Sequence, residues 1–304
     1  MIEASATAPD RTLQGIGWMV FTTLCFVTVT CIVRHLGNGM PAAEGAFIRY
    51  LIGLIMLLPL AGPLVRNPPG RRAWTIYTFR SLVHAIAVML WFYAMARVPI
   101  AEVTAIGYTA PIYVALGAAL FLGESMKLRR IIAILVAFAG TLIILRPGVQ
   151  EISPGHLAQV IAAPCFACSF LIAKRMTDTI DATSIVIMLS LGCTVFLFPV
   201  ALADWVDPSW DQIGWLALTA VFATAGHWSM TRAFGCAPIT VTQPVGFLQL
   251  VWATMLGMAI FGEPVDPWVL IGGAVVIGSA TYISHREAVA ARKARTPPAA
   301  ATKI

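Results

Sequence analysis

Charged residues are scarce in this sequence. Of its 304 residues only 11% are Asp, Glu, Lys or Arg, while 59% are hydrophobic. Soluble domains usually carry about 25% charged residues. A chain with so little charge lacks the polar surface that a soluble domain needs. The composition therefore excludes an ordinary soluble protein and predicts an all-α integral membrane protein.

Motifs of intramembrane enzymes and metal sites are also absent. The sequence has no His-Glu-x-x-His for zinc, no Gly-x-Ser-x-Gly around a nucleophile and no paired Asp clusters for Mg²⁺ and diphosphate. Cys165 and Cys168 have the spacing of a zinc or redox motif, but no second ligand pair or nearby His completes it, so we expect them to pack among apolar residues. We predict no metal, no cofactor and no enzymatic activity, and keep an intramembrane enzyme only as a remote alternative.

Ten long apolar segments are present instead. A helix needs about 20 apolar residues to cross a bilayer. The segments that meet this requirement are 13–33, 45–65, 74–96, 100–121, 128–145, 155–173, 184–203, 212–231, 239–261 and 265–284. Their connections hold only a few residues, so no separate soluble domain is expected. Residues 1–12 precede the first segment, and a basic tail, 285–304, follows the last.

The chain repeats itself. Pro99-Ile100 recurs as Pro238-Ile239, and Gly123-Glu124 recurs as Gly262-Glu263, each 139 residues later. Because each repeat holds five segments, an odd number, the second repeat enters the membrane from the opposite side. Inverted repeats of this kind are common in transporters. The predicted units are a first repeat, 13–146, and a second repeat, 147–284.

Basic residues are unevenly distributed between the predicted loops. If the N-terminus is cytoplasmic, the cytoplasmic side carries fifteen Lys and Arg residues and the outer side only Arg34, Arg97 and Arg146. By the positive-inside rule this bias predicts that both termini lie in the cytoplasm. The net charge of +6 follows from the same placement. We therefore expect no nucleic-acid partner; the predicted partners are the lipid bilayer and a small-molecule substrate.

Short motifs flank the fourth segment of each repeat. Arg97-Val98-Pro99-Ile100 and Cys236-Ala237-Pro238-Ile239 precede these segments, and Leu122-Gly123-Glu124 and Phe261-Gly262-Glu263 follow them. This pattern resembles the EamA-type ten-helix members of the drug/metabolite transporter superfamily, over about residues 13–284. The resemblance implies transport of small metabolites, including amino acids, across the inner membrane of bacteria. It also implies a central cavity lined by helices 1, 3, 4, 6, 8 and 9.

The two Gly-Glu turns have a structural explanation. Gly123 and Gly262 suit the left-handed conformation that ends a helix. Glu124 and Glu263 suit the start of the next helix, where a carboxylate complements the helix dipole. We expect these four residues to shape turns and caps rather than to contact a substrate.

Two polar residues of the third segment are the first site candidates. Arg80 and His84 are four residues apart, so they share one face of a helix. At 1.5 Å per residue, His84 lies about 15 Å from the cytoplasmic end, near the middle of the bilayer. Charged groups at such depth usually face a cavity or a partner. We predict that both residues contact the substrate; the alternatives are that Arg80 snorkels to the cytoplasm and that His84 is a packed core histidine.

Three further polar residues are weighed in the same way. Glu102 falls in the first turn of the fourth helix, where it either caps that helix or meets a substrate amine at the outer mouth. His227, deep in the eighth segment, is a candidate for the cavity wall. Arg49 lies near the outer end of the second segment, and we expect it to be an anchor or to pair with Glu44.

The repeat also predicts which residues of the two halves occupy equivalent positions. The offset of 139 residues maps Thr104 onto Gln243 and Tyr108 onto Phe247. Tyr108 and Phe247 would each lie about 12 Å from their own membrane face, near the midplane where inverted-repeat transporters bind substrate. Gln249 adds a polar group at similar depth. We therefore predict that Tyr108, Gln243, Phe247 and Gln249 belong to the substrate site.

The distribution of charge selects among substrate classes. The first and sixth segments contain no Asp or Glu, whereas multidrug relatives in the superfamily bind cations with a carboxylate in their first helix. A lining of Arg80, His84, aromatic rings and amides suits a zwitterion or an anion. We predict a secondary transporter for an amino acid or related zwitterion or anion, exporting it by alternating access. The alternative is an uptake carrier for a larger planar metabolite, such as a vitamin or nucleoside-derived cofactor. The sequence specifies neither a coupling ion nor an oligomeric state.

Overall fold

The computed structural model describes residues 11–66, 68–110, 112–113, 128–149 and 151–295. Within these ranges the chain is built of helices, without a β-strand. The first half supplies α1 (Thr12–Leu36), α2 (Ala42–Leu57), a short 3₁₀ turn (Leu58–Leu60), α3 (Gly62–Arg66), α4 (Arg71–Met95), α5 (Ile100–Gly107) and α7 (Leu128–Leu145). The second half supplies α8 (Pro154–Met176), α9 (Ala182–Ala203), α10 (Trp210–Cys236), α11 (Ile239–Gly246), α12 (Leu248–Phe261) and α13 (Pro267–Arg295).

Several of the described helices suit a lipid bilayer. Five are long and apolar enough to cross a membrane by length and composition, namely Thr12–Leu36, Ala42–Leu60, Ala73–Met95, Pro154–Met176 and Ala182–Ala203. On α9 the large apolar side chains of Val195, Phe198 and Leu202 are exposed, as expected for a surface that faces lipid. The number of ten crossings and the cytoplasmic position of both termini stay predictions.

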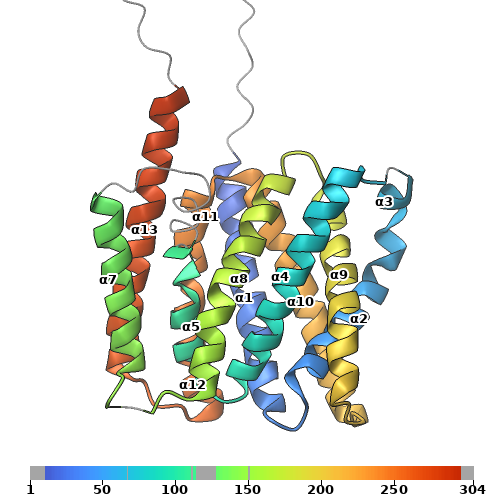
Figure 1. Ribbon diagram of the computed structural model, residues 1–304, viewed down its shortest axis with the longest axis horizontal. Coiled ribbons are helices and arrows are strands. Elements are labelled where there is room, and N and C mark those ends of the chain that lie inside the picture. Colours follow the sequence, from blue (N-terminus) through green and yellow to red (C-terminus); the bar gives the residue numbers. More distant parts are fainter. Residues whose placement is uncertain (1–10, 67, 111, 114–127, 150, 296–304) are drawn as a thin grey trace, which may run out of the picture.

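The two halves run in opposite directions through the bundle. Helix α1 begins and α13 ends at the same face, at the top of Figure 1, which we call the terminal face. Helix α8 opens the second half from the other side, which we call the opposite face, so it runs antiparallel to α1. This reversal is what two repeats with an odd number of crossings require.

The most extensive helix packing joins the two halves. Helix α1 packs on α10 and α4 packs on α8, which is the same pairing with the halves exchanged. Helix α2 packs on α9 and α7 on α13, so each of these helices meets its own repeat counterpart. Between α7 and α13 a Cβ atom on Gly272 would lie 2.6 Å from the carbonyl oxygen of Gly140, so glycine permits this close approach.

The fourth segment of each half is interrupted at the same repeat position. Helix α5 ends at Gly107, and α11 ends at Gly246, 139 residues later. Helix α12 starts directly afterwards at Leu248, so the predicted ninth segment, 239–261, consists of two helices rather than one. Glycine is a poor helix former, which favours an interruption here. A helix end leaves backbone carbonyls without an intrahelical partner, and these must be satisfied by other groups.

Candidate functional site

A cavity of about 330 Å³ lies between the two halves. Its wall comes mainly from α1, α4, α5, α8, α10 and α12, which correspond to the six helices that the resemblance implied. Arg49 of α2 and Ile283 of α13 also reach it. Most of the wall is apolar, and its aromatic members are Phe26, Trp91, Tyr108, Phe166, Phe170, Phe234 and Phe247.

Five of the eight predicted site residues line this cavity. These are His84, Tyr108, His227, Phe247 and Gln249. Arg80 and Glu102 are not among the lining residues. The side chain of Gln243 lies outside the described part of the structure. The position of the five at the cavity is thus a structural finding, whereas contact with a substrate stays a prediction.

The two aromatic residues that the repeat places at equivalent positions contact each other across the two halves. The ring centroids of Tyr108 and Phe247 are 4.8 Å apart, and the rings are nearly perpendicular at 81°. Both residues sit at the helix interruptions, since each follows the glycine that ends its helix. The Tyr108 hydroxyl donates a hydrogen bond of 3.0 Å to the Gly246 carbonyl oxygen. A carbonyl at the end of α11 is therefore satisfied by a side chain from the other half.

Arg80 is buried in the bundle but does not reach the cavity. Its side chain is only 1% exposed. The guanidinium donates from Nε to the Ser169 carbonyl oxygen at 3.2 Å and from an Nη atom to the Ile185 carbonyl oxygen at 3.3 Å. Arg80 thus neither snorkels to the terminal face nor lines the cavity. It joins α4 to α8 and α9 through backbone carbonyls.

His84 and His227 form the polar centre of the cavity wall. The His84 ring is fully buried, and its Nδ1 lies 2.9 Å from the Ser169 hydroxyl. The ring of His227 lies 5.2 Å away, centroid to centroid. In the described part of the chain, Nε2 of His84 and Nδ1 of His227 have no hydrogen-bond partner. Both imidazoles therefore retain hydrogen-bonding capacity next to the cavity.

Arg49 is a cavity residue that the sequence analysis placed elsewhere. The side chain is 5% exposed and lines the cavity, and its guanidinium carbon lies 3.8 Å from the centre of the Tyr50 ring. The expected pairing with Glu44 does not form, because Glu44 accepts a 3.0 Å hydrogen bond from the Val206 backbone N–H instead. The presence of an arginine within an apolar segment is the sequence signal that points to such a role.

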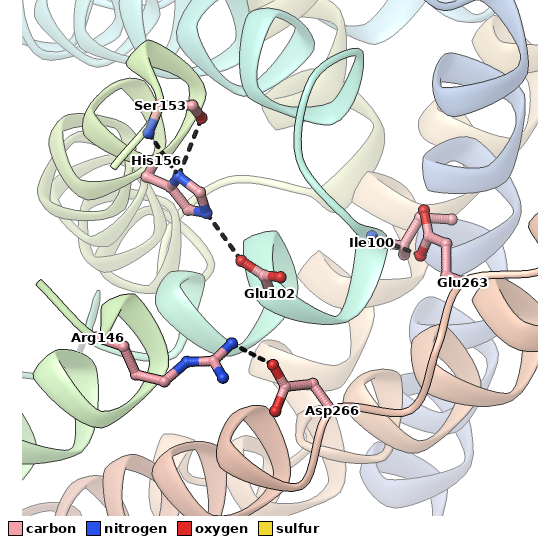
Figure 2. Close-up of polar contacts among 7 residues, drawn as sticks. All are labelled: Ile100, Glu102, Arg146, Ser153, His156, Glu263 and Asp266. Atoms are coloured by element: carbon pink, nitrogen blue, oxygen red, sulfur yellow. Dashed lines mark hydrogen bonds and ion pairs between the residues drawn. The ribbon is translucent and has the colours of Figure 1, made fainter. Parts of the chain in front are cut away.

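Glu102 belongs to a polar cluster at the opposite face (Figure 2). Its Oε2 lies 2.8 Å from Nε2 of His156 on α8. Nδ1 of His156 accepts the backbone N–H of Ser153 at 3.1 Å. A neutral imidazole with Nδ1 as acceptor carries its proton on Nε2, so His156 donates to the Glu102 carboxylate. Glu102 therefore fastens α5 of the first half to α8 of the second.

Two ion pairs complete the cluster. Glu263 lies 3.1 Å from Nε of Arg34 through one carboxylate oxygen. Through the other it accepts the Ile100 backbone N–H at 3.0 Å (Figure 2). Arg146 and Asp266 form the second ion pair. Each of these contacts joins the first half to the second. Where both partners are described, all ion pairs and the His–carboxylate pair thus lie at one face of the bundle and cross between the halves.

The structure confirms part of what the sequence predicts for the Gly262-Glu263 turn. Gly262 adopts the left-handed conformation with a φ of 63°. Glu263 does cap a helix, but this helix is α5 of the other half rather than the helix that follows the turn. The equivalent residues Gly123 and Glu124 lie outside the described residues.

Comparisons with known proteins connect this architecture to a family. Residues 13–146 and 153–285 both match the EamA-like transporter family. The riboflavin transporter of Vibrio cholerae is 28% identical over 289 residues, which cover 93% of this chain and 97% of the relative. The S-adenosylmethionine uptake transporter of Rickettsia felis is 26% identical over 278 residues, which cover 90% of this chain and 94% of the relative.

Further similarities span the same part of the chain. The riboflavin transporter of Rhizobium johnstonii is 28% identical over 296 residues, covering 95% of this chain and 96% of the relative. A solved crystal structure with 18% sequence identity shares the fold, with a TM-score of 0.57 over 90% of this chain and 98% of that one. The family matches cover both repeats and most of the chain. The chain therefore belongs to the EamA-like transporter family and is a multi-pass protein of the bacterial inner membrane.

Proposed function

We propose that this protein takes up a planar heteroaromatic metabolite across the inner membrane. The observation that carries the proposal is the aromatic wall of the central cavity. Phe166 and Phe170 stack with ring centroids 5.7 Å apart and an interplanar angle of 14°, and Tyr108 and Phe247 meet edge to face in the same cavity. Aromatic side chains in such arrangements give a flat ring a large contact area and a defined orientation.

The size and polarity of the cavity support the same substrate class. Its volume of about 330 Å³ falls within the range of about 300–1,000 Å³ that is usual for sites of drug-sized ligands. Thr104, Gln159 and Gln249 add neutral hydrogen-bonding groups that suit ring nitrogens and ring carbonyls. An amino acid would leave most of the aromatic wall uncovered. The lining therefore favours a planar metabolite over an amino acid as the substrate.

The named relatives support uptake as well. Two of them are called riboflavin transporters and one an S-adenosylmethionine uptake transporter, and both compounds contain fused planar rings. No relative among these supports amino-acid export or an intramembrane enzyme. In the described residues, no group of three or more His, Cys, Asp or Glu is arranged to hold a metal ion.

The closed opposite face fits an alternating-access cycle. The polar cluster ties the halves together there, while the cavity wall extends toward the terminal face as far as Met19 and Phe234. We infer that this conformation is closed to the outside. Release of the inter-half contacts would then open the cavity to the outer face.

Uptake into proteoliposomes that contain the full chain tests the proposal. We expect saturable flux of labelled riboflavin or S-adenosylmethionine and none of labelled amino acids. Phe166→Ala, which removes one stacked ring, should lower the flux. Leu191→Ala, at an exposed position of α9, is the matched control and should not. Flux of amino acids without flux of either planar compound contradicts the proposal.

A further inference from the structure

The cavity wall contains a positive charge that no acidic side chain of the described residues balances. Arg49 is 5% exposed, and none of the described residues that line the cavity is Asp or Glu. In the described part of the chain, Arg49 forms no ion pair, and its Nε has no hydrogen-bond partner. Buried charges are normally paired, because burial removes their hydration. Among the described residues, this guanidinium contacts the face of the Tyr50 ring.

Arg97 shows that a tyrosine ring alone does not explain this arrangement. Its guanidinium carbon lies 3.6 Å from the centre of the Tyr93 ring, nearly the same stacking as for Arg49 and Tyr50. However, Arg97 is exposed, so water hydrates its charge. Arg49 has the same ring contact but lies inside the bundle. Its charge therefore calls for a further partner, which the described part of the chain does not supply.

Other polar groups of the cavity wall also have hydrogen-bonding atoms without a partner among the described residues. Nε2 of His84, Nδ1 of His227 and Oε1 of Gln159 all belong to cavity-lining residues and have no hydrogen-bond partner among the described residues. Arg80 contributes a second buried positive charge behind the wall, and its hydrogen bonds go to carbonyl oxygens, which carry no full negative charge. The centre of the bundle thus has two cationic side chains and several unused hydrogen-bonding atoms.

We propose that Arg49 is the centre of an anion subsite in the cavity. It takes the carboxylate or phosphate group of the transported metabolite, while His84 and His227 stand beside it as hydrogen-bonding groups. A guanidinium suits this role because it offers charge-assisted hydrogen bonds to both kinds of oxyanion. The inference rests on the proposed function and deepens it. The substrate has a planar body for the aromatic wall and an anionic group for Arg49.

Matched pairs of probes test the subsite. Nicotinate and nicotinamide differ in one carboxylate, and riboflavin 5′-phosphate and riboflavin differ in one phosphate. Calorimetry on the full chain in detergent should show that the anionic member of at least one pair binds about tenfold more tightly. Arg49→Gln should remove this preference by weakening only the anionic compound, and Arg49→Lys should restore part of it. An equal preference in the wild type and Arg49→Gln overturns the proposal.

A second measurement needs no planar ligand. Melting temperatures are compared in sodium chloride and in sodium sulfate at equal ionic strength for the wild type, Arg49→Gln and Arg97→Gln. Sulfate stabilises proteins in general, so the informative quantity is the additional rise in the wild type. We expect the wild type and Arg97→Gln to rise equally and Arg49→Gln to rise less. An identical rise in all three proteins contradicts an anion subsite at Arg49.

The two measurements separate this inference from the proposed function. If sulfate acts through Arg49 while no planar probe of either pair binds, the anion subsite stands, a free inorganic anion occupies it, and uptake of a planar metabolite fails. If planar probes bind without regard to charge, uptake of a planar metabolite stands and the anion subsite fails.

Discussion

The opposite face and the central cavity both contain arginine side chains, but these differ in whether a carboxylate pairs with them. At the opposite face, Arg34 and Arg146 each meet a carboxylate of the other half. In the cavity, Arg49 meets none among the described residues. A paired charge holds two parts of a protein together, whereas an unpaired buried charge is available to a ligand. The difference indicates a closing function for the face and a binding function for the centre.

Membrane orientation gives the largest expected effect, because its readout is all or none. If the polar cluster closes the outer side, the terminal face is cytoplasmic. Reporters fused after Arg72, Arg130 and Arg175 should then read cytoplasmic, and reporters after Asn38 and Asp207 should read external. A cytoplasmic signal at both Asn38 and Asp207 would refute the ten-helix inverted arrangement. It would also mean that the polar cluster lies on the cytoplasmic side of the membrane.

Loss of the Glu263 charge should produce the largest change in stability. Glu263→Gln leaves Arg34 without its carboxylate, and the loss of this charge-assisted contact in a partly buried pair costs about 2–3 kcal/mol. We expect a lower melting temperature and faster labelling of the nearby Cys31 by a membrane-impermeant thiol reagent, located by mass spectrometry. Arg97→Gln, at an exposed arginine outside the cluster, is the control and should change neither. Unchanged labelling would show that the cluster does not close this face.

A double-mutant cycle sharpens the same test. Arg34→Gln and Glu263→Gln act on one ion pair. The double variant should therefore lose less stability than the sum of the two single variants, because the contact can be lost only once. Additive losses would mean that the two residues stabilise the protein independently.

Arg80 is intermediate between the paired arginines of the opposite face and the unpaired Arg49. It is buried, and its hydrogen bonds go to carbonyl oxygens. Arg80→Gln should lower the free energy of unfolding by about 2 kcal/mol through the lost hydrogen bonds. Ligand affinity of the folded protein should remain close to the wild type, because Arg80 does not line the cavity. Calorimetric binding beside melting curves measures both effects. A selective loss of affinity with unchanged stability would return Arg80 to the substrate site predicted from sequence.

The sequence predicts features that depend on the repeat itself. The offset of 139 residues predicts that Tyr108 and Phe247 occupy equivalent positions at similar depth, and both line the cavity. Such symmetry relates positions far apart in the chain without knowledge of side-chain packing. For the same reason the left-handed turn at Gly262 could be predicted, since it depends only on local backbone geometry.

The roles of the arginines could not be predicted in this way. Depth along a helix places Arg80 and Arg49 in the membrane, but a long side chain can reach any of several neighbouring helices. Which one it reaches depends on tertiary packing that no local pattern encodes. Likewise, Glu263 bonds the backbone of Ile100 across 163 residues of chain. Its spacing in the sequence suggests only a cap on the next helix.

Substitutions in the aromatic pair test substrate binding in the central cavity, and their expected effect is smaller. Tyr108→Ala and Phe247→Ala should each weaken binding of a planar substrate by about 1–2 kcal/mol, the scale of a lost aromatic contact. The double variant should lose less than the sum, because one bound molecule bridges both positions. Calorimetry measures the affinities. Unchanged affinity with lowered melting temperatures for both variants would place the substrate elsewhere.

The smallest expected effect separates the structural role of Tyr108 from its contact with a ligand. Tyr108→Phe keeps the ring beside Phe247 but removes the hydroxyl that donates to the Gly246 carbonyl. Because this carbonyl lies at a helix end, the lost hydrogen bond should lower the free energy of unfolding by about 1 kcal/mol. Substrate affinity should remain unchanged, since the ring face is retained. The reverse substitution, Phe247→Tyr, adds a hydroxyl without a prearranged acceptor and serves as the matched control. If Tyr108→Phe weakens binding but not stability, the hydroxyl contacts the ligand instead of holding the interrupted helix.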